Sequence, residues 1–489
     1  FGTVFLGLTV GCAQCHDHKF DPISQRDYYQ LFAFFNSTEE DGHGKGAPTG
    51  MLEIPGEFEP MESARKELEE ARADLDRYLN TKGSEVTQRE ENLSPEARLK
   101  LSKQVLALAQ TPWSERTPAQ KRVSYAAFKA DDPDFKTRNT KVSRLEKREP
   151  KPITTLVMKE LKEPRDSFVF IKGDFTRPAQ KVKPGVPAVL HKLLASDDRT
   201  LNRLDLARWV VAPENPLLAR VIVNRVWQQF FGRGLVETDN DFGTQGSGPS
   251  HSELLDWLAL EFMAPTVTNA PPWSLKHIHR LIANSTTYRQ SSHTRPELAN
   301  IDPTNRLLAR QSRIRLDAEN VRDAALSASG LLSPELGGPP VYPPQPDGVM
   351  SLGQVKREWK ASTGAQRHRR ALYTHLWRAT PHPSLAVFDA PDGFSTCTRR
   401  LRSNTPLQAL TLLNDQQFFE FAQALAQRLR TVPGGESSKI KQACLYCLGR
   451  EPSPAEQERL TQLLRSEGED RWLALARVML NLDETITRE

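Results

Sequence analysis

The spacing of apolar side chains predicts helices over most of the chain. In residues 24–35 the side chains of Tyr28, Leu31, Phe32 and Phe35 recur at helical spacing, and Ser24 begins the pattern of a capping box. Similar spacing returns in residues 206–211, 217–231, 254–262, 274–283, 317–329 and 406–429. We therefore expect a fold that is mainly α with minor β, including a helical C-terminal domain.

Strand-like patterns are short and few. Residues 154–158 and 167–171 are rich in β-branched and aromatic side chains, and the second stretch leads into a turn at Lys172 and Gly173. Residues 370–377 alternate between apolar and polar positions as a strand does. These patterns predict a small β-containing segment near 153–190 and a minor β contribution elsewhere.

At 489 residues the chain is too long for one ordinary core, so we expect several packed units. Phe1 runs directly into a cysteine motif, and we expect the chain to begin inside its first domain. Changes in composition predict five parts: a truncated first domain (1–57), a charged helical insertion (58–150), a β-rich or extended connection (151–195), a helical domain (196–432) and a C-terminal helical segment (433–489).

Charge excludes some classes of partner. Lys and Arg total 66 against 61 Asp and Glu, and a formal net charge of +5 is small for this length. This balance does not indicate nucleic-acid binding. The sequence contains no run of about 18 apolar residues, so it does not predict a membrane span. The motifs of nucleophile-elbow hydrolases, metalloproteases, P-loop enzymes and dinucleotide-binding enzymes do not occur.

The cysteines carry the strongest chemical signal. All five fall into two CxxC pairs and one single residue: Cys12 with Cys15, Cys444 with Cys447, and Cys397. The first pair lies in GCAQCHDHKF and is followed at once by His16. CxxCH is the attachment pattern of a c-type haem, in which both thiols add to porphyrin vinyl groups and the histidine ligates the iron. We therefore expect covalent haem c at this motif.

Two other interpretations of the motif are weaker. A thioredoxin-like dithiol needs a strand before Cys12, which residues 3–10 could form, and a helix after it, which Asp21 and Pro22 would break. A zinc site built from the two cysteines with His16 and His18 would crowd four ligands into seven residues, whereas zinc sites draw on separated segments.

The sixth position on a haem iron has several candidates. Among residues near in sequence, His43, Met51 and Met158 are candidate distal ligands. His18 is two residues from His16 and could not readily reach the opposite face of the same haem. A hydrogen-bonding or substrate-facing role suits His18 better, which makes it the candidate catalytic residue.

The remaining cysteines and an arginine cluster have structural interpretations. Cys444 and Cys447 are followed by Leu448, so they lack the ligand of a haem motif and are predicted to be packed thiols of an apolar helix. Cys397 is predicted to be a buried structural thiol. Residues 399–402 are rich in arginine beside Asn404 and could hold carboxylates or sulfate esters, although structural ion pairs are favoured.

Two regions also resemble known families. Residues 11–24 and 27–35 resemble the C-terminal end of the planctomycete cytochrome-type domain of unknown function. Residues 220–236, 249–258, 388–392 and 404–414 resemble the planctomycete-specific domain that follows it. The resemblance implies a large exported bacterial protein, often with a separate cytochrome c domain upstream, and hence a periplasmic or otherwise extracytoplasmic location. Cys12, Cys15, His16 and His18 all match the pattern.

These observations lead to one leading expectation and two alternatives. We expect an extracytoplasmic c-type haem protein engaged in electron transfer. If the protein is an enzyme, we expect an oxidoreductase that acts on a saccharide-type substrate. A redox partner, an upstream cytochrome c domain and a polysaccharide are the expected partners. The alternatives are a non-catalytic secreted binding module whose CxxC is structural, and a zinc-dependent hydrolase. Whether the protein is an enzyme stays open.

Overall fold

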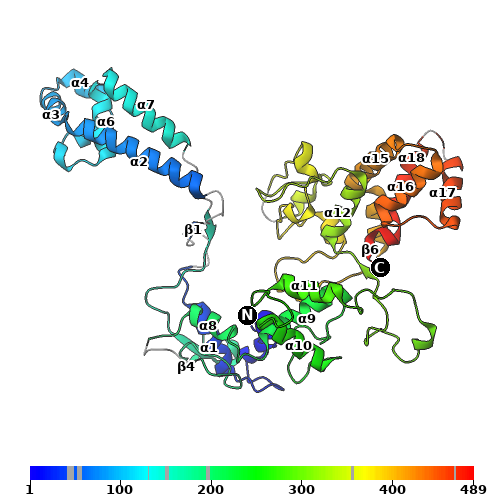
Figure 1. The fold of residues 1–489 in the computed structure, drawn as a ribbon. Helices are drawn as coiled ribbons and strands as arrows, with labels where there is room; N and C mark the ends of the chain where they lie inside the picture. Colours follow the sequence, from blue (N-terminus) through cyan, green and yellow to red (C-terminus); the bar gives the residue numbers. More distant parts are fainter. Residues whose placement is uncertain are drawn as a thin grey trace. The chain divides into compact units, whose positions relative to one another are not determined.

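The computed structural model describes residues 1–40, 49–51, 58–129, 131–148, 154–193, 199–353, 357–466, 468 and 470–488, excluding the side chains of 49, 51, 58–61, 100 and 154. The chain divides into two compact units, Phe1–Asn36 with Asp166–Glu489 and, between them in sequence, Ser37–Arg165. The structure is mainly helical with short two-stranded sheets, as the sequence predicts (Figure 1). In the described part of the chain, no helix is long and apolar enough to cross a membrane.

The first unit begins with tight helical turns. A π-helix, η1 (Gly2–Leu6), is followed by a 3₁₀ helix, η2 (Val10–Gln14), and by α1 (Gln25–Asn36). The predicted capping box is confirmed, since Ser24 N–H donates to Asp27 Oδ2 at 2.8 Å and Asp27 N–H donates to Ser24 Oγ at 3.1 Å. The buried face of α1 differs from the predicted one.

That buried face carries Tyr29, Leu31 and Phe34, whereas Tyr28 and Phe35 are half-buried. Because the helix packs on a hairpin as well as on the N-terminal turns, a wider face is covered than one apolar stripe predicts. The hairpin pairs β3 (Ser167–Phe170) antiparallel with β4 (Pro178–Val182), with an irregular register after Phe168. Apolar residues of η1, η2 and α1 share a core with α8 (Arg203–Val210).

The middle of the first unit is a helical layer. A second core joins α9 (Leu218–Phe231), α10 (Ser252–Met263) and α11 (Leu275–Asn284). Helix α9 ends where Gly232 adopts a φ of 77°, the left-handed conformation that favours glycine at a helix end. Helix α10 has no side-chain N-cap, because His251 takes the N-cap position and its side chain makes no cap hydrogen bond.

The C-terminal helices share a third core. They are α12 (Ala318–Ser329), α13 (Pro383–Val387), α14 (Pro406–Asn414), α15 (Gln416–Thr431), α16 (Glu436–Leu448), α17 (Pro454–Ser466) and α18 (Arg471–Asn481). A single helix over 406–429 was expected, and this expectation is wrong. The chain breaks at Asp415, whose side chain accepts from Gln417 N–H and caps a new helix.

Two short elements complete the unit. The strand expected in residues 370–377 is absent: the segment forms a 3₁₀ turn and a single bridge between Thr374 and Val341. Near the end of the described chain, β5 (Ile314–Arg315) pairs antiparallel with β6 (Thr487–Arg488). The 3₁₀ turn in residues 370–377 is η8 (Ala371–Tyr373), and the unit also contains η4 (Ile171–Gly173), η5 (Pro296–Leu298), η6 (Val349–Leu352), η7 (Gly364–His368) and η9 (Asp483–Ile486), whereas η3 (Trp113–Glu115) belongs to the second unit.

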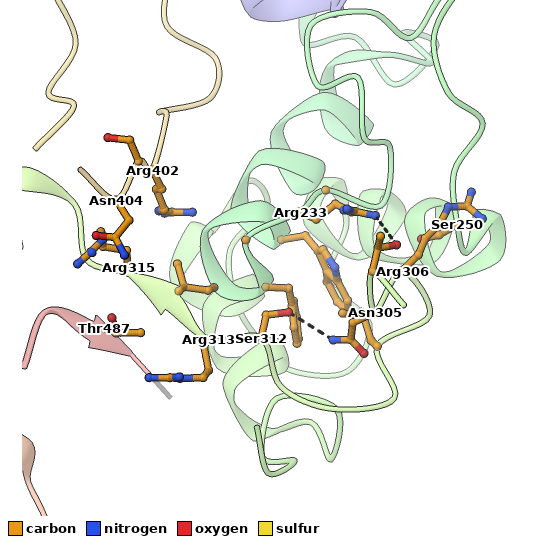
Figure 2. Close-up of a pocket in the computed structure, with 18 of the residues that line it drawn as sticks. Arg233, Ser250, Asn305, Arg306, Ser312, Arg313, Arg315, Arg402, Asn404 and Thr487 are labelled. Atoms are coloured by element: carbon orange, nitrogen blue, oxygen red, sulfur yellow. Dashed lines mark hydrogen bonds between the residues drawn. The ribbon is translucent and has the colours of Figure 1, made fainter. Parts of the chain in front are cut away.

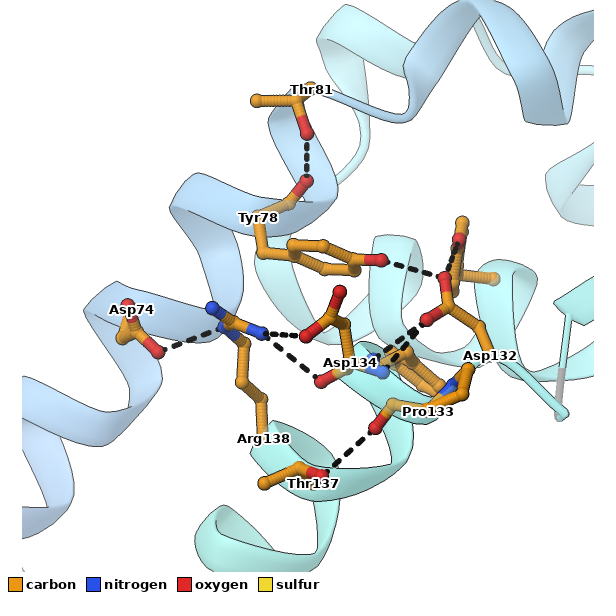
Figure 3. Close-up of polar contacts among 10 residues, drawn as sticks. Asp74, Tyr78, Thr81, Asp132, Pro133, Asp134, Thr137 and Arg138 are labelled. Atoms are coloured by element: carbon orange, nitrogen blue, oxygen red, sulfur yellow. Dashed lines mark hydrogen bonds and ion pairs between the residues drawn. The ribbon is translucent and has the colours of Figure 1, made fainter.

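The second unit is a small helical body. Its elements are β1 (Thr49–Met51), α2 (Phe58–Asn80), α3 (Gly83–Glu91), α4 (Pro95–Lys100), α5 (Lys103–Leu108), α6 (Pro118–Lys129), α7 (Pro133–Arg148) and β2 (Thr154–Leu156), which pairs with β1. Just before α7, Asp132 accepts hydrogen bonds from the hydroxyl group of Tyr78 at 2.6 Å (Figure 3) and from that of Tyr125 at 2.5 Å. These hydrogen bonds hold the pKa of Asp132 well below its ordinary value.

Candidate functional site

The CxxCH motif lies on the surface of the first unit. Cys12 is part of η2 and Cys15 is its C-cap residue, and both are exposed free thiols. Residues 3–10, considered above as the strand of a thioredoxin-like dithiol, form no strand: residues 3–6 belong to the π-helix, residues 7–9 to no regular element and Val10 to the 3₁₀ helix. The thiols therefore project from a tight, irregular turn.

This turn is held by the backbone carbonyl of Gln14. That oxygen accepts hydrogen bonds from Gln25 Nε2 at 3.0 Å and from Tyr29 Oη at 3.1 Å, both on α1. Gln25 Nε2 also donates to the carbonyl of Phe170 on β3 at 2.9 Å. One helix and one hairpin strand thus anchor the backbone between the two cysteines. These hydrogen bonds use backbone carbonyls and not the thiols, which are both free.

His16 is exposed, and one ring nitrogen is already oriented. Its Nδ1 lies 2.7 Å from the backbone carbonyl of Asp17. A carbonyl can only accept, so Nδ1 carries the proton and the lone pair is on Nε2. A donor bond from Nδ1 to a carbonyl is the usual way of presenting Nε2 to a metal. Within the described residues, no hydrogen bond to Nε2 competes for it.

His18 is placed quite differently, with its side chain almost fully buried. Its Nδ1 accepts from the backbone N–H of Asp21 at 2.9 Å, and its Nε2 therefore donates to Thr9 Oγ1 at 3.0 Å. Both ring nitrogens are occupied in joining the turn before Cys12 to the turn after His16. A catalytic role for His18 would require breaking these bonds.

Asp21 extends this anchoring to a distant loop. Its Oδ1 accepts from Thr244 N–H at 2.7 Å. Burial raises the pKa of Asp21, but the hydrogen bonds from Thr244 and the nearby His18 outweigh it, and the pKa lies below the ordinary value. The carboxylate is therefore a stable acceptor that ties the motif to the loop before α10.

A hairpin loop lies against Cys15. Lys172 and Gly173 have φ values of 54° and 75°, so the loop between β3 and β4 turns tightly. A Cβ at Gly173 would lie 2.8 Å from Cys15 Sγ, which is too close for any side chain. Beside it Ile171 and Phe175 are exposed by 41% and 78%. The sequence predicted the turn at 172–173 but not this contact, because no local signal marks a neighbour so remote in the chain.

The described residues show no contact between the CxxCH motif and any of the three candidate distal ligands. His43 lies outside the described residues, and so does the side chain of Met51. Met158 is exposed and belongs to the second unit. Among the residues that the structure describes, no group of three or more His, Cys, Asp and Glu side chains is placed to hold a metal ion.

The other predicted thiols separate into a correct and a wrong prediction. Cys444 is buried and Cys447 half-buried in α16, and burial raises their pKa values to about 11 and about 12. Both pack on the C-terminal core, as expected. Cys397 was expected to be buried but is exposed, because it lies in an open loop, where its thiol donates to the carbonyl of Arg399.

Two of the three arginines in residues 399–402, Arg400 and Arg402, form the structural ion pairs that were favoured. Arg400 Nη2 lies 3.1 Å from Glu319 Oε1, and Arg402 Nη2 lies 3.3 Å from Asp317 Oδ1. Arg402 and Asn404 also line a cavity.

Comparison with known families confirms the resemblance noted in the sequence. Residues 1–40 match PSCyt2, described as a protein of unknown function (DUF1549), and residues 202–464 match PSD1, described as a protein of unknown function (DUF1553). No curated protein and no solved structure matches the chain. The PSD1 match covers more than half of the 489 residues of the chain. This protein therefore belongs to the PSD1 family of planctomycete-type proteins of unknown function.

Proposed function

We propose that the chain is an extracytoplasmic c-type haem protein that transfers electrons. Cys12 and Cys15 would hold the haem through thioethers, and His16 Nε2 would be the axial ligand of the iron. The observation that carries the proposal is the pair of exposed, free thiols beside a histidine whose Nδ1 is bound to a carbonyl. When bound, the haem supplies a one-electron redox centre.

The residues around the motif fit such a group. Each thioether forms by addition of S–H across a vinyl double bond, so the thiols must be free and accessible. Gly173 places no side chain beside Cys15 Sγ, and the exposed Ile171 and Phe175 offer an apolar surface for a large apolar ring. The name PSCyt2 of the family matched by residues 1–40 also points to a cytochrome-related family.

Partners and substrate follow from the same proposal. Electrons would pass to a redox partner or to a cytochrome c domain elsewhere in the protein. A saccharide-type substrate would make the protein an oxidoreductase, and a polysaccharide would then be a binding partner.

The test is spectroscopic. The chain is expressed with the c-type cytochrome maturation system, and the pyridine haemochrome spectrum is recorded. We expect a Soret band and a thioether-type haemochrome that disappear in the Cys12→Ser/Cys15→Ser variant and persist in Cys444→Ser/Cys447→Ser. A folded, colourless wild-type protein would contradict the proposal, and stoichiometric zinc in its place would favour the hydrolase.

A second measurement separates the two histidines. His16→Ala should keep the covalent haem but change the Soret band, because an axial ligand is lost. His18→Ala should leave the Soret band in place, since both of its nitrogens bond to protein groups. The reverse pattern would assign the iron to His18.

A further inference from the structure

The first unit contains a cavity of about 490 Å³ that the haem proposal does not use. It is bounded by the C-terminal end of α9, the loop 304–313, strand β5, the segment 402–404 and strand β6 (Figure 2). The volume lies in the range of small-molecule sites in proteins, roughly 300–1,000 Å³. Trp227 and Phe231 contribute aromatic surface, and the other lining groups are largely polar.

The lining is strongly cationic. It includes five arginines and one acidic residue, Asp483; the arginines are Arg233, Arg306, Arg313, Arg315 and Arg402. Figure 2 shows Arg402, Arg315 and Arg313 on one side of the pocket and Arg233 and Arg306 on the other. The positive groups are therefore arranged in two sets across one cavity.

In the first set, two arginines lie beside the same acidic side chain. Asp483 lies 3.4 Å from Arg313 Nη2 and 3.6 Å from Arg315 Nη2, so one exposed carboxylate serves two guanidinium groups. Arg315 is only 13% exposed, and its Nη1 is buried without a hydrogen-bond partner in the described part of the chain. Arg402 Nε is likewise buried without a hydrogen-bond partner in the described part of the chain, although Arg402 Nη2 contacts Asp317. These two unpaired donors leave the guanidinium groups of Arg315 and Arg402 only partly hydrogen-bonded within the described residues.

The second set is more open. Arg233 is 3.7 Å from Glu237 and donates to Thr304 Oγ1 at 3.4 Å. Arg306 is exposed and reaches only the carbonyl of Gly248, at 3.5 Å; no carboxylate of the described residues lies within ion-pair distance of it. Asp302 nearby accepts from backbone N–H groups, and the arginines help to keep its pKa below the ordinary value.

We propose that this cavity binds a small ligand that carries two or more phosphate or sulfate groups. Guanidinium groups match tetrahedral oxyanions through paired N–H donors, and sites on two sides of a cavity suit a ligand with two separated anionic groups. One group is held by Arg313, Arg315 and Arg402, and the other by Arg233 and Arg306. Asn404 and Ser312 add uncharged donors. The assignment does not depend on a haem.

Calorimetry on the full chain tests the proposal with two probes, inorganic pyrophosphate and a trisulfated disaccharide. We expect saturable binding of at least one probe, and the tighter of the two identifies phosphate or sulfate as the source. Arg306→Gln should weaken that binding about tenfold, because a hydrogen-bonded charge pair is lost. Arg310→Gln is the matched control, since Arg310 is in the same loop but does not line the cavity.

A second variant guards against misfolding. Arg315→Gln removes a nearly buried group, so its melting temperature is measured beside Arg306→Gln, which changes an exposed one. Loss of binding in a folded Arg306→Gln protein, with partial rescue in Arg306→Lys, supports the assignment. Absence of binding of both probes to the wild type, or equal loss in Arg306→Gln and Arg310→Gln, overturns it.

Discussion

The chain contains the same CxxC spacing twice, in opposite surroundings. Cys12 and Cys15 lie on an irregular turn at the surface, followed by an exposed histidine. Cys444 and Cys447 lie within the α-helix α16 and pack on a core. Burial raises the pKa values of the second pair, which keeps those thiols protonated. The comparison teaches that spacing alone does not define a reactive pair, whereas backbone geometry and solvent access do.

The largest contrast is expected in thiol chemistry. In protein made without haem, we expect iodoacetamide at pH 8 to alkylate Cys12 and Cys15 at least about 1000-fold faster than Cys444, because the buried thiol reacts only after local opening. Mass spectrometry of tryptic peptides over time measures the rates. Similar alkylation rates for the two pairs would contradict the difference in solvent access between them.

Stability should separate the pairs next. Cys444→Ser places a hydroxyl in a core and should lower the free energy of unfolding by about 2 kcal/mol. Cys12→Ser, at an exposed position, should change it by less than about 0.5 kcal/mol. Denaturation in guanidinium, with both variants made without haem, measures the two values. Equal effects would show that Cys444 is not part of the core.

High pH should reveal the buried pair through stability. The folded pKa values of about 11 and about 12 lie above the value of about 8.5 for a free thiol. The unfolded chain therefore releases protons first, and this contribution to stability is intact below pH 8.5 and falls as pH rises toward 12. Allowing for the half-exposure of Cys447, we expect a loss of about 1 kcal/mol per pH unit that is absent in Cys444→Ala/Cys447→Ala. Parallel curves for the two proteins would contradict it.

The smallest effect concerns the two histidines of the surface motif. His18→Ala removes bonds to Thr9 and Asp21 and should cost about 1 kcal/mol of stability, whereas His16→Ala should cost little. Thermal melting of the haem-free proteins makes the comparison. If His16→Ala were the more destabilising variant, His16 would have a structural role, which would contradict the proposal that its Nε2 is free to ligate the iron.

Sequence patterns predicted much of the fold and part of the site. Helical periodicity and the Ser24 cap located α1, and the apolar spacing of residues 217–231 located α9. The break at Asp415 was missed because its apolar spacing continues on both sides, so only the cap reveals it. Cys397 was misjudged because burial depends on neighbours that the local sequence does not contain.

The sequence by itself determined the CxxCH pattern, the mainly helical class and the family resemblance, since these depend on residue type and short-range spacing. Tertiary structure alone decided that His16 presents Nε2 while His18 is buried, and that Gly173 lies against Cys15. It also decided that arginines between residues 233 and 402 line one cavity. The physical reason is that solvent access, hydrogen-bond pairing and electrostatic crowding arise from segments that fold together from distant parts of the chain.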